Sequence, residues 1–212
     1  LIAKHKCYEV KTIGDSFMVA AATAEQAVLF ATDVQVALKK CDWTTDLFDD
    51  IYEELLTAEF TQPRDAWGGL RVRIGVHFGS GSVVYDEVSK GFDYYGQVAN
   101  LASRIESAAH GGQVVVSQSA LTAITDANAG FLAQHGLVSK SLGGHTLRGC
   151  EDDEVLCQVT PEALSKRTFP PLRNGPARAD SGVFEGPATV PGSAANSAVG
   201  DGAAYCDSDP LD

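Results

Sequence analysis

The stretch from Leu70 to Phe78 alternates strictly between apolar and polar side chains, and this pattern constrains the fold strongly. The apolar set is Leu70, Val72, Ile74, Val76 and Phe78, and the polar set includes Arg71, Arg73 and His77. Successive side chains of a strand point to opposite faces, so the alternation predicts a half-buried strand. The chain is therefore expected to contain a sheet with one face packed on a core.

Two amphipathic helices are predicted on either side of this strand. The first stripe, at i, i+3, i+4 and i+7 spacing, consists of Ala24, Ala27, Val28, Ala31, Val34 and Leu38. Thr23 precedes it as the natural N-cap. The second stripe consists of Val98, Leu101, Ala102, Ile105 and Ala109, and Gly111-Gly112 is expected to end that helix.

The other segments complete a mixed α+β pattern. Two short β-prone runs, residues 7–12 and 17–21, flank Ile13-Gly14-Asp15-Ser16 and predict a hairpin. A buried strand at 114–116, a brief helix at 119–124 and two or three strands within 137–159 follow. In chain order these elements predict a ferredoxin-like α+β sandwich with a mostly antiparallel sheet.

Three regions are distinguished along the 212 residues. We expect one domain over residues 1–165. Residues 43–67 are acidic, irregular and aromatic, which suggests an inserted subdomain within it. Apolar periodicity disappears after about residue 168, and residues 166–212 are expected to form a disordered tail.

Composition excludes several classes of protein. The formal net charge of −12 argues against binding a nucleic-acid backbone, which requires clustered Lys and Arg. Five scattered cysteines with no CxxC pair suggest neither a disulfide framework nor a zinc site, and fit a reducing cytosol. No stretch approaches the roughly 20 apolar residues of a membrane span. The chain opens with Leu within a pattern, so we interpret it as a piece of a longer protein whose membrane segments, if any, lie elsewhere.

Three segments resemble motifs of one enzyme family. Glu9–Met18 (EVKTIGDSFM) is similar to a K-x-x-G-D hairpin, and Arg73–Gly79 (RIGVHFG) to an R-[VI]-G-[IV]-H-x-G strand. Phe92–Gly96, followed by Val98–Arg104, is similar to D-x-x-G-x-x-x-N-x-A-x-R. Together and in order, they resemble the catalytic domain of class III nucleotidyl cyclases, most closely the receptor-type adenylyl cyclases of trypanosomatids.

The resemblance implies a lyase that converts ATP to 3′,5′-cyclic AMP and pyrophosphate. The ribose 3′ oxygen attacks the α-phosphorus, and such a transfer requires positioning and charge neutralisation. The family uses two Mg²⁺ or Mn²⁺ ions held by two carboxylates. Asp15 matches one of them, although Gly-Asp is also ordinary turn chemistry. The family's other carboxylate lies in an F-x-D-I strand that no residue here matches, so we expect this chain alone to be nearly inactive.

Lys11 and Asp93 match the positions that read the base. Lys is a donor only and ionised Asp an acceptor only, so the pair complements N1 and the 6-amino group of adenine. Each would meet a like group on guanine, and guanylyl cyclases of the family carry Glu and a small polar residue or Cys there. Taken singly, Lys11 could be a solvated strand residue and Asp93 a loop acceptor.

Four further residues match family positions that contact the ribose and phosphates. Asn100 and Arg104 lie four residues apart on the second helix, off its apolar stripe. The resemblance assigns Asn100 to the ribose and Arg104 to the reacting phosphate, and a solvated helix face is the alternative. Arg73 matches a triphosphate-binding Arg, and Arg148 stands where the family has a Lys.

The family's sites are shared between protomers of a head-to-tail homodimer. Each site would take Asp15 and Arg73 from one chain and the remaining residues from the other. The resemblance implies ATP as substrate, no nucleic-acid partner, and a cytoplasmic domain of a plasma-membrane receptor, attached to the membrane through other parts of the parent chain.

Two other interpretations fit the sequence less well. A non-catalytic cyclase-homology domain that regulates an active partner has no physical need for all of Lys11, Asp15, Asp93, Asn100 and Arg104. A ferredoxin-like RNA binder is excluded by the acidic charge and the lack of an aromatic sheet motif.

Overall fold

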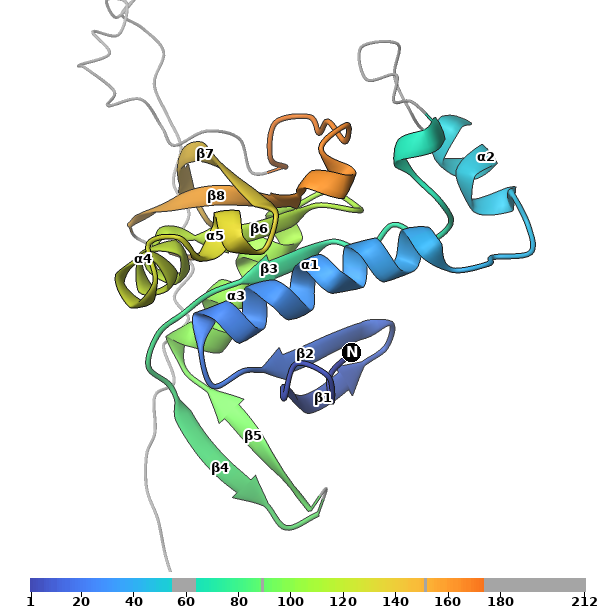
Figure 1. The fold of residues 1–212 in the computed structure, drawn as a ribbon. Coiled ribbons are helices and arrows are strands. Elements are labelled where there is room, and N and C mark those ends of the chain that lie inside the picture. The colour runs from blue at the N-terminus through green and yellow to red at the C-terminus, as the bar shows by residue number, and fades with distance from the viewer. Residues whose placement is uncertain (55–63, 89, 151, 174–212) are drawn as a thin grey trace, which may run out of the picture. The chain divides into compact units, whose positions relative to one another are not determined.

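A four-stranded sheet carries the core of the molecule (Figure 1). The computed structural model describes residues 1–54, 64–88, 90–150 and 152–173. The strands, in spatial order, are β3 (Ile74–Val76), β6 (Val114–Ser117), β8 (Asp153–Pro161) and β7 (Leu137–Thr146). β3 pairs with β6 in parallel, whereas the β6–β8 and β7–β8 pairs are antiparallel. The predicted mixed α+β fold with a mostly antiparallel sheet is confirmed.

Helices cover both faces of this sheet. Every residue of β6 is buried, and its valines alternate between the two faces. Val114 and Val116 pack with α1 (Ala24–Lys40) and α4 (Gln118–Ala127), while Val115 packs with α3 (Gln97–Ala108) on the other side. A strand buried on both faces reads as an unbroken apolar run, which is why Val-Val-Val identified it.

The helix boundaries follow local signals. The Thr23 hydroxyl accepts a hydrogen bond from the Gln26 N–H at 3.3 Å, as expected of the predicted N-cap. α3 ends before Gly111-Gly112, also as predicted. Ser117 caps α4, which is longer than the brief helix expected, and a short helix, α5 (Phe131–Gln134), was not anticipated.

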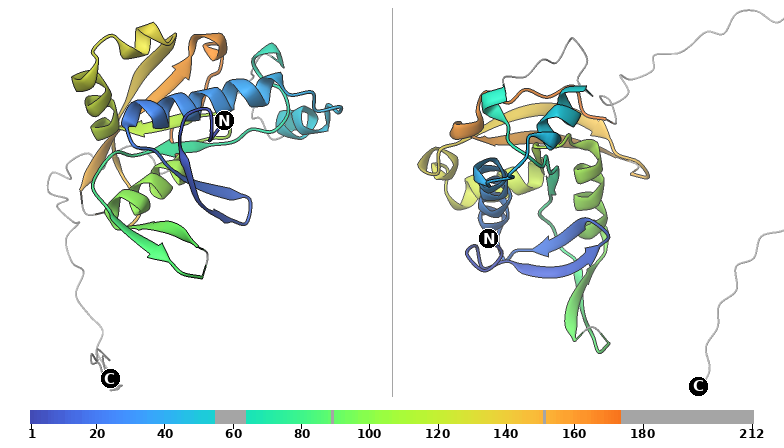
Figure 2. Two further views of the ribbon diagram at one scale, coloured as in Figure 1. Left: turned by 60° about the horizontal axis from the view of Figure 1, so that its bottom comes forward. Right: turned by 90° about the vertical axis from the view of Figure 1, so that its right-hand side faces the viewer.

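Two hairpins lie side by side below α1 (Figures 1 and 2). The first, β1 (Tyr8–Ile13) and β2 (Ser16–Ala20), is the predicted one, and Gly14 adopts φ = 62° at its turn. The second, β4 (Ser82–Asp86) and β5 (Gly91–Tyr95), was not predicted. Each hairpin forms its own two-stranded sheet among the described residues.

The alternating stretch forms a shorter strand than the sequence suggested. Only Ile74–Val76 pairs with β6, and the ends of the stretch, Leu70 and Phe78, are 40% and 45% exposed. Before the strand, the Val72 carbonyl accepts a hydrogen bond from the Gln35 side chain at 2.7 Å. The same carbonyl also accepts from the Gly112 N–H at 2.9 Å, so a side chain and one backbone bond hold the chain there.

The predicted insertion at 43–67 contains α2 (Leu47–Glu54) and a 3₁₀ turn, η2 (Arg64–Ala66), while residues 55–63 lie outside the described residues. The guanidinium carbons of Arg71 and Arg167 each lie 4.3 Å from the centroid of the Trp67 ring. Burial, and secondarily the charge of Arg71, lowers the pKa of Arg167 to about 10. That the segment is a separate subdomain stays a prediction.

Arg167 also falls within the predicted tail. It is 7% exposed and donates to the carbonyl oxygens of Ala66 and Gly112 at 3.0 and 3.2 Å. Leu172, 5% exposed, joins the apolar cluster around α3. The packed part of the chain therefore extends beyond residue 165, and the rest of the predicted tail, 174–212, lies outside the described residues.

Candidate active site

Lys11 of β1 and Asp93 of β5 form an ion pair across the two hairpins. The Lys11 Nζ lies 2.8 and 2.7 Å from the two carboxylate oxygens of Asp93. The hairpins are tied together beside the pair, since the Phe92 N–H donates to the Tyr8 hydroxyl at 2.8 Å. The Tyr8 ring also contacts the Phe92 ring edge-on, with 6.4 Å between the ring centroids, and its centroid lies 6.3 Å from that of Tyr94. The two residues that the sequence analysis assigned together to base recognition are thus adjacent.

The surroundings keep both members of the pair charged. The hydrogen bond to Asp93 raises the pKa of Lys11, and the hydrogen bonds from Lys11 and then Tyr95 lower the pKa of Asp93. The pKa of Tyr95 is raised, chiefly by its hydrogen bond to Asp93. The Lys11 Nζ also lies over the Tyr95 ring, 5.5 Å from its centroid. The side chains of Lys11 and Asp93 are 38% and 20% exposed, so a ligand can reach them.

Asp15 stands exposed at the tip of the β1–β2 hairpin, in the turn opened by Gly14. Its carboxylate can offer oxygen ligands of the kind that Mg²⁺ and Mn²⁺ prefer. Within residues 1–54, 64–88, 90–150 and 152–173, no group of three or more His, Cys, Asp or Glu could hold an ion together. Asp15 therefore fits the role of one ligand among several, and an ion here would need oxygens from elsewhere.

Arg73, just before β3, forms an ion pair with Glu106 of α3 through its Nε. The two side chains are 37% and 32% exposed, so the pair lies at the surface. The strand and helix approach closely here, because a Cβ on Gly75 would lie 2.3 Å from the Glu106 backbone nitrogen. Arg73 is thus held beside α3 rather than extended into solvent.

Asn100 and Arg104 lie one helical turn apart on α3, as predicted. Asn100 is exposed, whereas Arg104 is partly buried and donates from Nη1 to the Cys150 sulfur at 3.1 Å. The neighbouring Gly149 leaves room for this arrangement, because a Cβ there would be 3.3 Å from Arg104 Nη2.

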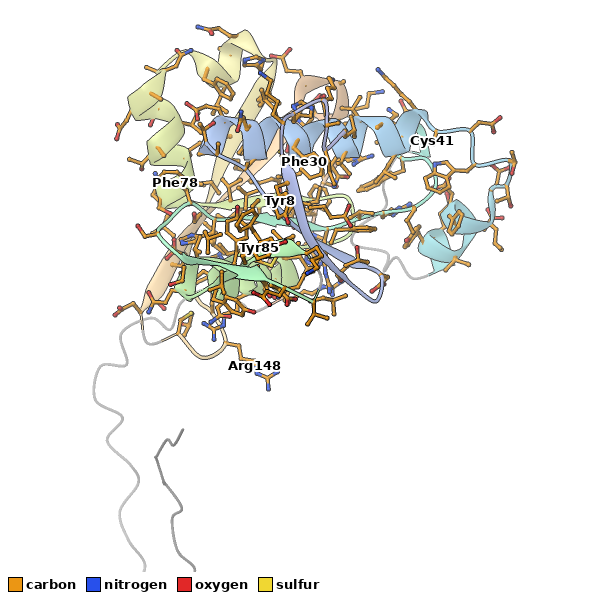
Figure 3. The ribbon with its side chains drawn as sticks, turned by 90° about the horizontal axis from the view of Figure 1, so that it is seen from below. Tyr8, Phe30, Cys41, Phe78, Tyr85 and Arg148 are labelled. Atoms are coloured by element: carbon orange, nitrogen blue, oxygen red, sulfur yellow. The ribbon has the colours of Figure 1, made fainter. Side chains whose placement is uncertain are left out.

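Arg148 is exposed and points away from the ribbon (Figure 3). It occupies a tight turn in which the Cys150 N–H donates to the Leu147 carbonyl at 3.0 Å. Leu147 is fully buried and anchors this turn. Arg104 and Arg148, two of the predicted phosphate-binding residues, are therefore joined through one four-residue turn.

Sequence reasoning missed three residues that contact the predicted set: Tyr95, Glu106 and Cys150. Tyr95 could have been found, since residues two apart in a strand share a face and Asp93 is two positions earlier. The partners of Arg73 and Arg104 are tertiary contacts with no local sequence signal.

Residues 1–149 match the family described as "Adenylate and Guanylate cyclase catalytic domain". The chain belongs to this family. Cyclase catalytic domains of this family generally use divalent metal ions, act as dimers and, in the adenylate cyclases, take ATP as substrate.

Curated relatives include receptor-type adenylate cyclases of trypanosomatids. The chain is 37% identical over 188 residues to "Receptor-type adenylate cyclase GRESAG 4.3" of Trypanosoma brucei brucei, covering 82% of this chain and 15% of that protein. It is 41% identical over 164 residues to "Receptor-type adenylate cyclase A" of Leishmania donovani, covering 70% of this chain and 12% of that protein. The cyclase domain described here thus spans a small part of the length of these relatives.

Solved structures of cyclase domains are similar to this chain. A structure of adenylate cyclases from Trypanosoma brucei in their monomeric state is 37% identical, with a TM-score of 0.73, and the match covers 81% of this chain and 78% of that one. The guanylate cyclase domain of RhGC from Catenaria anguillulae, in complex with GTP, is 20% identical with a TM-score of 0.51, covering 76% and 75%, and shares the fold. In the described part of this cyclase domain, no helix is long and apolar enough to cross a bilayer.

Proposed function

We propose that this domain is the catalytic part of an adenylyl cyclase that converts ATP to cyclic AMP and pyrophosphate. The observation that carries the proposal is the Lys11–Asp93 pair. Adenine presents its N1 acceptor and 6-amino donor on adjacent atoms, so the residues that read them must also be adjacent. Lys11 keeps a third ammonium hydrogen for N1, and the Asp93 carboxylate keeps lone pairs for the amino group.

The remaining residues are assigned by the charge that each can offer. Arg104, partly buried and held by Cys150, would stabilise negative charge on the reacting α-phosphate. Asn100, one turn earlier and exposed, would orient the ribose. Arg73 and Arg148 would bind the β- and γ-phosphates. To do so, Arg73 must either keep its ion pair with Glu106 while also bonding a phosphate, or break that ion pair.

Asp15 would contribute one carboxylate to two Mg²⁺ or Mn²⁺ ions. Such ions, when bound, activate the attacking ribose oxygen and neutralise the triphosphate. The exposed hairpin tip lets Asp15 reach a ligand without burying its own backbone. Removing its side chain should therefore leave the fold unaffected.

The site is proposed to form between two copies of the chain in a head-to-tail dimer. Asp15 lies at the tip of its hairpin, whereas Lys11 faces Asp93 along β1. In the dimer, Asp15 and Arg73 of one copy would complete the site formed by Lys11, Asp93 and α3 of the other. The receptor-type names of the relatives support the proposal that this domain belongs to a membrane receptor, and we place it on the cytoplasmic side of the plasma membrane.

A mixing experiment tests activity and assembly together. Full-length Asp15→Ala and Arg104→Ala chains should each lose cyclic AMP formation. Mixed equally, they should recover about one quarter of wild-type activity, since half the dimers are mixed and one of their two sites is intact. Asp126→Ala, which removes an exposed carboxylate from α4, is the matched control and should remain active. Folded variants that form mixed dimers without recovering activity would contradict the shared site.

A further inference from the structure

Tyr95 lies on the same face of β5 as Asp93 and beside Lys11. Residues two apart in a strand share a face, and β5 is paired in regular register with β4 through Tyr95. The Lys11 Nζ lies 5.5 Å from the Tyr95 ring centroid while bonding both oxygens of Asp93. The Tyr95 side chain is half-exposed, so it lines the accessible side of the pair.

The Lys11–Asp93 pair selects adenine when Lys11 faces purine position 1 and Asp93 faces position 6, so the order of the two side chains along the base edge must be fixed. In that order, adenine is satisfied by both residues. If their order along the base edge is reversed, Lys11 donates to O6 and Asp93 accepts from N1–H, and guanine is satisfied instead. Base choice therefore depends on which of the two side chains is held at which position.

Lys side chains are long and flexible, so a free ammonium could swing to either side of a carboxylate. The ring of Tyr95 restricts this freedom, since a cation is attracted to the electron-rich face of an aromatic ring. The raised pKa of Tyr95 and the lowered pKa of Asp93 agree with a hydroxyl that also contacts the carboxylate. Tyr95 thus contacts both members of the pair.

We propose that Tyr95 is a positioning residue that sets base specificity, by holding Lys11 on one side of Asp93 so that the pair reads adenine and not guanine. This inference rests on the proposed adenylyl cyclase function. Tyr95 itself need not touch the base. Its effect should appear in the preference between nucleotides more than in the rate with ATP.

The test measures kcat/KM for ATP and for GTP in the full-length protein. Tyr95→Leu should lower the ATP-to-GTP ratio of kcat/KM by about two- to fivefold, the range of an exposed cation–π contact. Tyr95→Phe keeps the ring and should lower the ratio less. Tyr85→Leu is the matched control, because Tyr85 is also half-exposed on the same hairpin, and its ratio should equal that of the wild type.

A Tyr95→Leu variant that cyclises ATP and keeps the wild-type ATP-to-GTP ratio of kcat/KM would overturn this inference but not the proposed function. An equal shift in Tyr85→Leu would also overturn it, because the effect would then belong to the hairpin. If Tyr95→Leu fails to fold, Tyr95→Gln is measured by the same criteria. A wild-type protein that forms no cyclic AMP would instead remove the proposed function.

Discussion

Arg104 on α3 donates from Nη1 to the sulfur of Cys150, 46 residues later, at 3.1 Å. The turn that carries Cys150 is anchored by buried Leu147 and closed by a backbone hydrogen bond of 3.0 Å. Cys150 is itself partly buried against the apolar cluster around α3. The guanidinium proposed to act on the reacting phosphate is therefore held by a residue outside the proposed substrate-binding set.

Replacing Cys150 should impair catalysis more than substrate binding. Cys150→Ala removes the acceptor and should lower kcat for ATP roughly fivefold, corresponding to about 1 kcal/mol for a net hydrogen bond to a charged group with a weak acceptor. Cys150→Ser keeps an acceptor and should lose less. Steady-state kinetics on both variants would check this. An alanine variant with wild-type kcat would show that Arg104 is oriented by other contacts.

Gly75 should tolerate no side chain. A Cβ there would lie 2.3 Å from the Glu106 backbone nitrogen and 2.6 Å from the Ala102 carbonyl oxygen, both on α3. Since backbone atoms must move to admit it, Gly75→Ala should lower the free energy of unfolding by about 3 kcal/mol, at the upper end of overpacking effects. Urea denaturation would measure this change. The exposed Ser139→Ala on β7 should change stability by less than about 0.5 kcal/mol, and a similarly small change for Gly75→Ala would contradict the close approach.

The sequence predicted some elements of the fold and of the candidate site but not the contacts between them. The buried strand at Val114–Val116, the helix capped by Thr23 and the Gly14-Asp15 turn were readable, because burial on both faces, capping and positive φ each demand particular residue types. The motif positions of Lys11 and Asp93 were also readable. Their direct contact was not, because it depends on how two separate hairpins pack.

The β4–β5 hairpin was missed for a different reason. Val83, Val84 and Tyr85 of β4 are all about half-exposed. A strand with no buried face shows no alternation of apolar and polar residues, so its periodicity carries no signal. The β-branched and aromatic composition of the two segments was the one available clue. For Leu70–Phe78 the sequence predicted too long a strand, because the alternation extends beyond the three residues that pair with β6.

His77 should make the fold sensitive to mild acid. Burial lowers the pKa of His77 below its usual value, while Glu154 opposes this to a lesser extent, and the ring nitrogen Nδ1 lies 2.9 Å from the Ser117 hydroxyl. On unfolding, the pKa returns to about 6.5, so below that pH the unfolded chain binds more protons. Stability from this group is therefore full above about pH 6.5 and falls as pH drops towards the folded pKa.

The measurement is the free energy of unfolding at pH 7.5 and pH 5.5. The wild type should lose more stability over this interval than His77→Gln, which has no titrating ring. Since carboxylates contribute equally to both proteins, the difference between their losses isolates His77. Parallel losses in the two proteins would mean that the imidazole titrates alike in the folded and unfolded states.

The last prediction tests base recognition at the Lys11–Asp93 pair itself. Exchanging Lys11 for Glu and Asp93 for Cys presents an acceptor to guanine N1 and N2 and removes the carboxylate that would face O6. A buried hydrogen bond left unpaired by the wrong base costs about 1–3 kcal/mol, so two of them imply roughly two to four decades of discrimination. In the full-length protein, the double variant should lose ATP cyclisation and gain measurable GTP cyclisation.

The matched control makes the same exchanges at exposed sites, Lys140→Glu with Asp126→Cys, and should keep the wild-type preference for ATP. It separates base recognition from the change in net charge, because both double variants alter the charge equally. A folded double variant at positions 11 and 93 that still prefers ATP would mean that other residues read the base. The adjacency of Lys11 and Asp93 would then serve only to join the two hairpins, since the pair links β1 to β5 whether or not a base is bound.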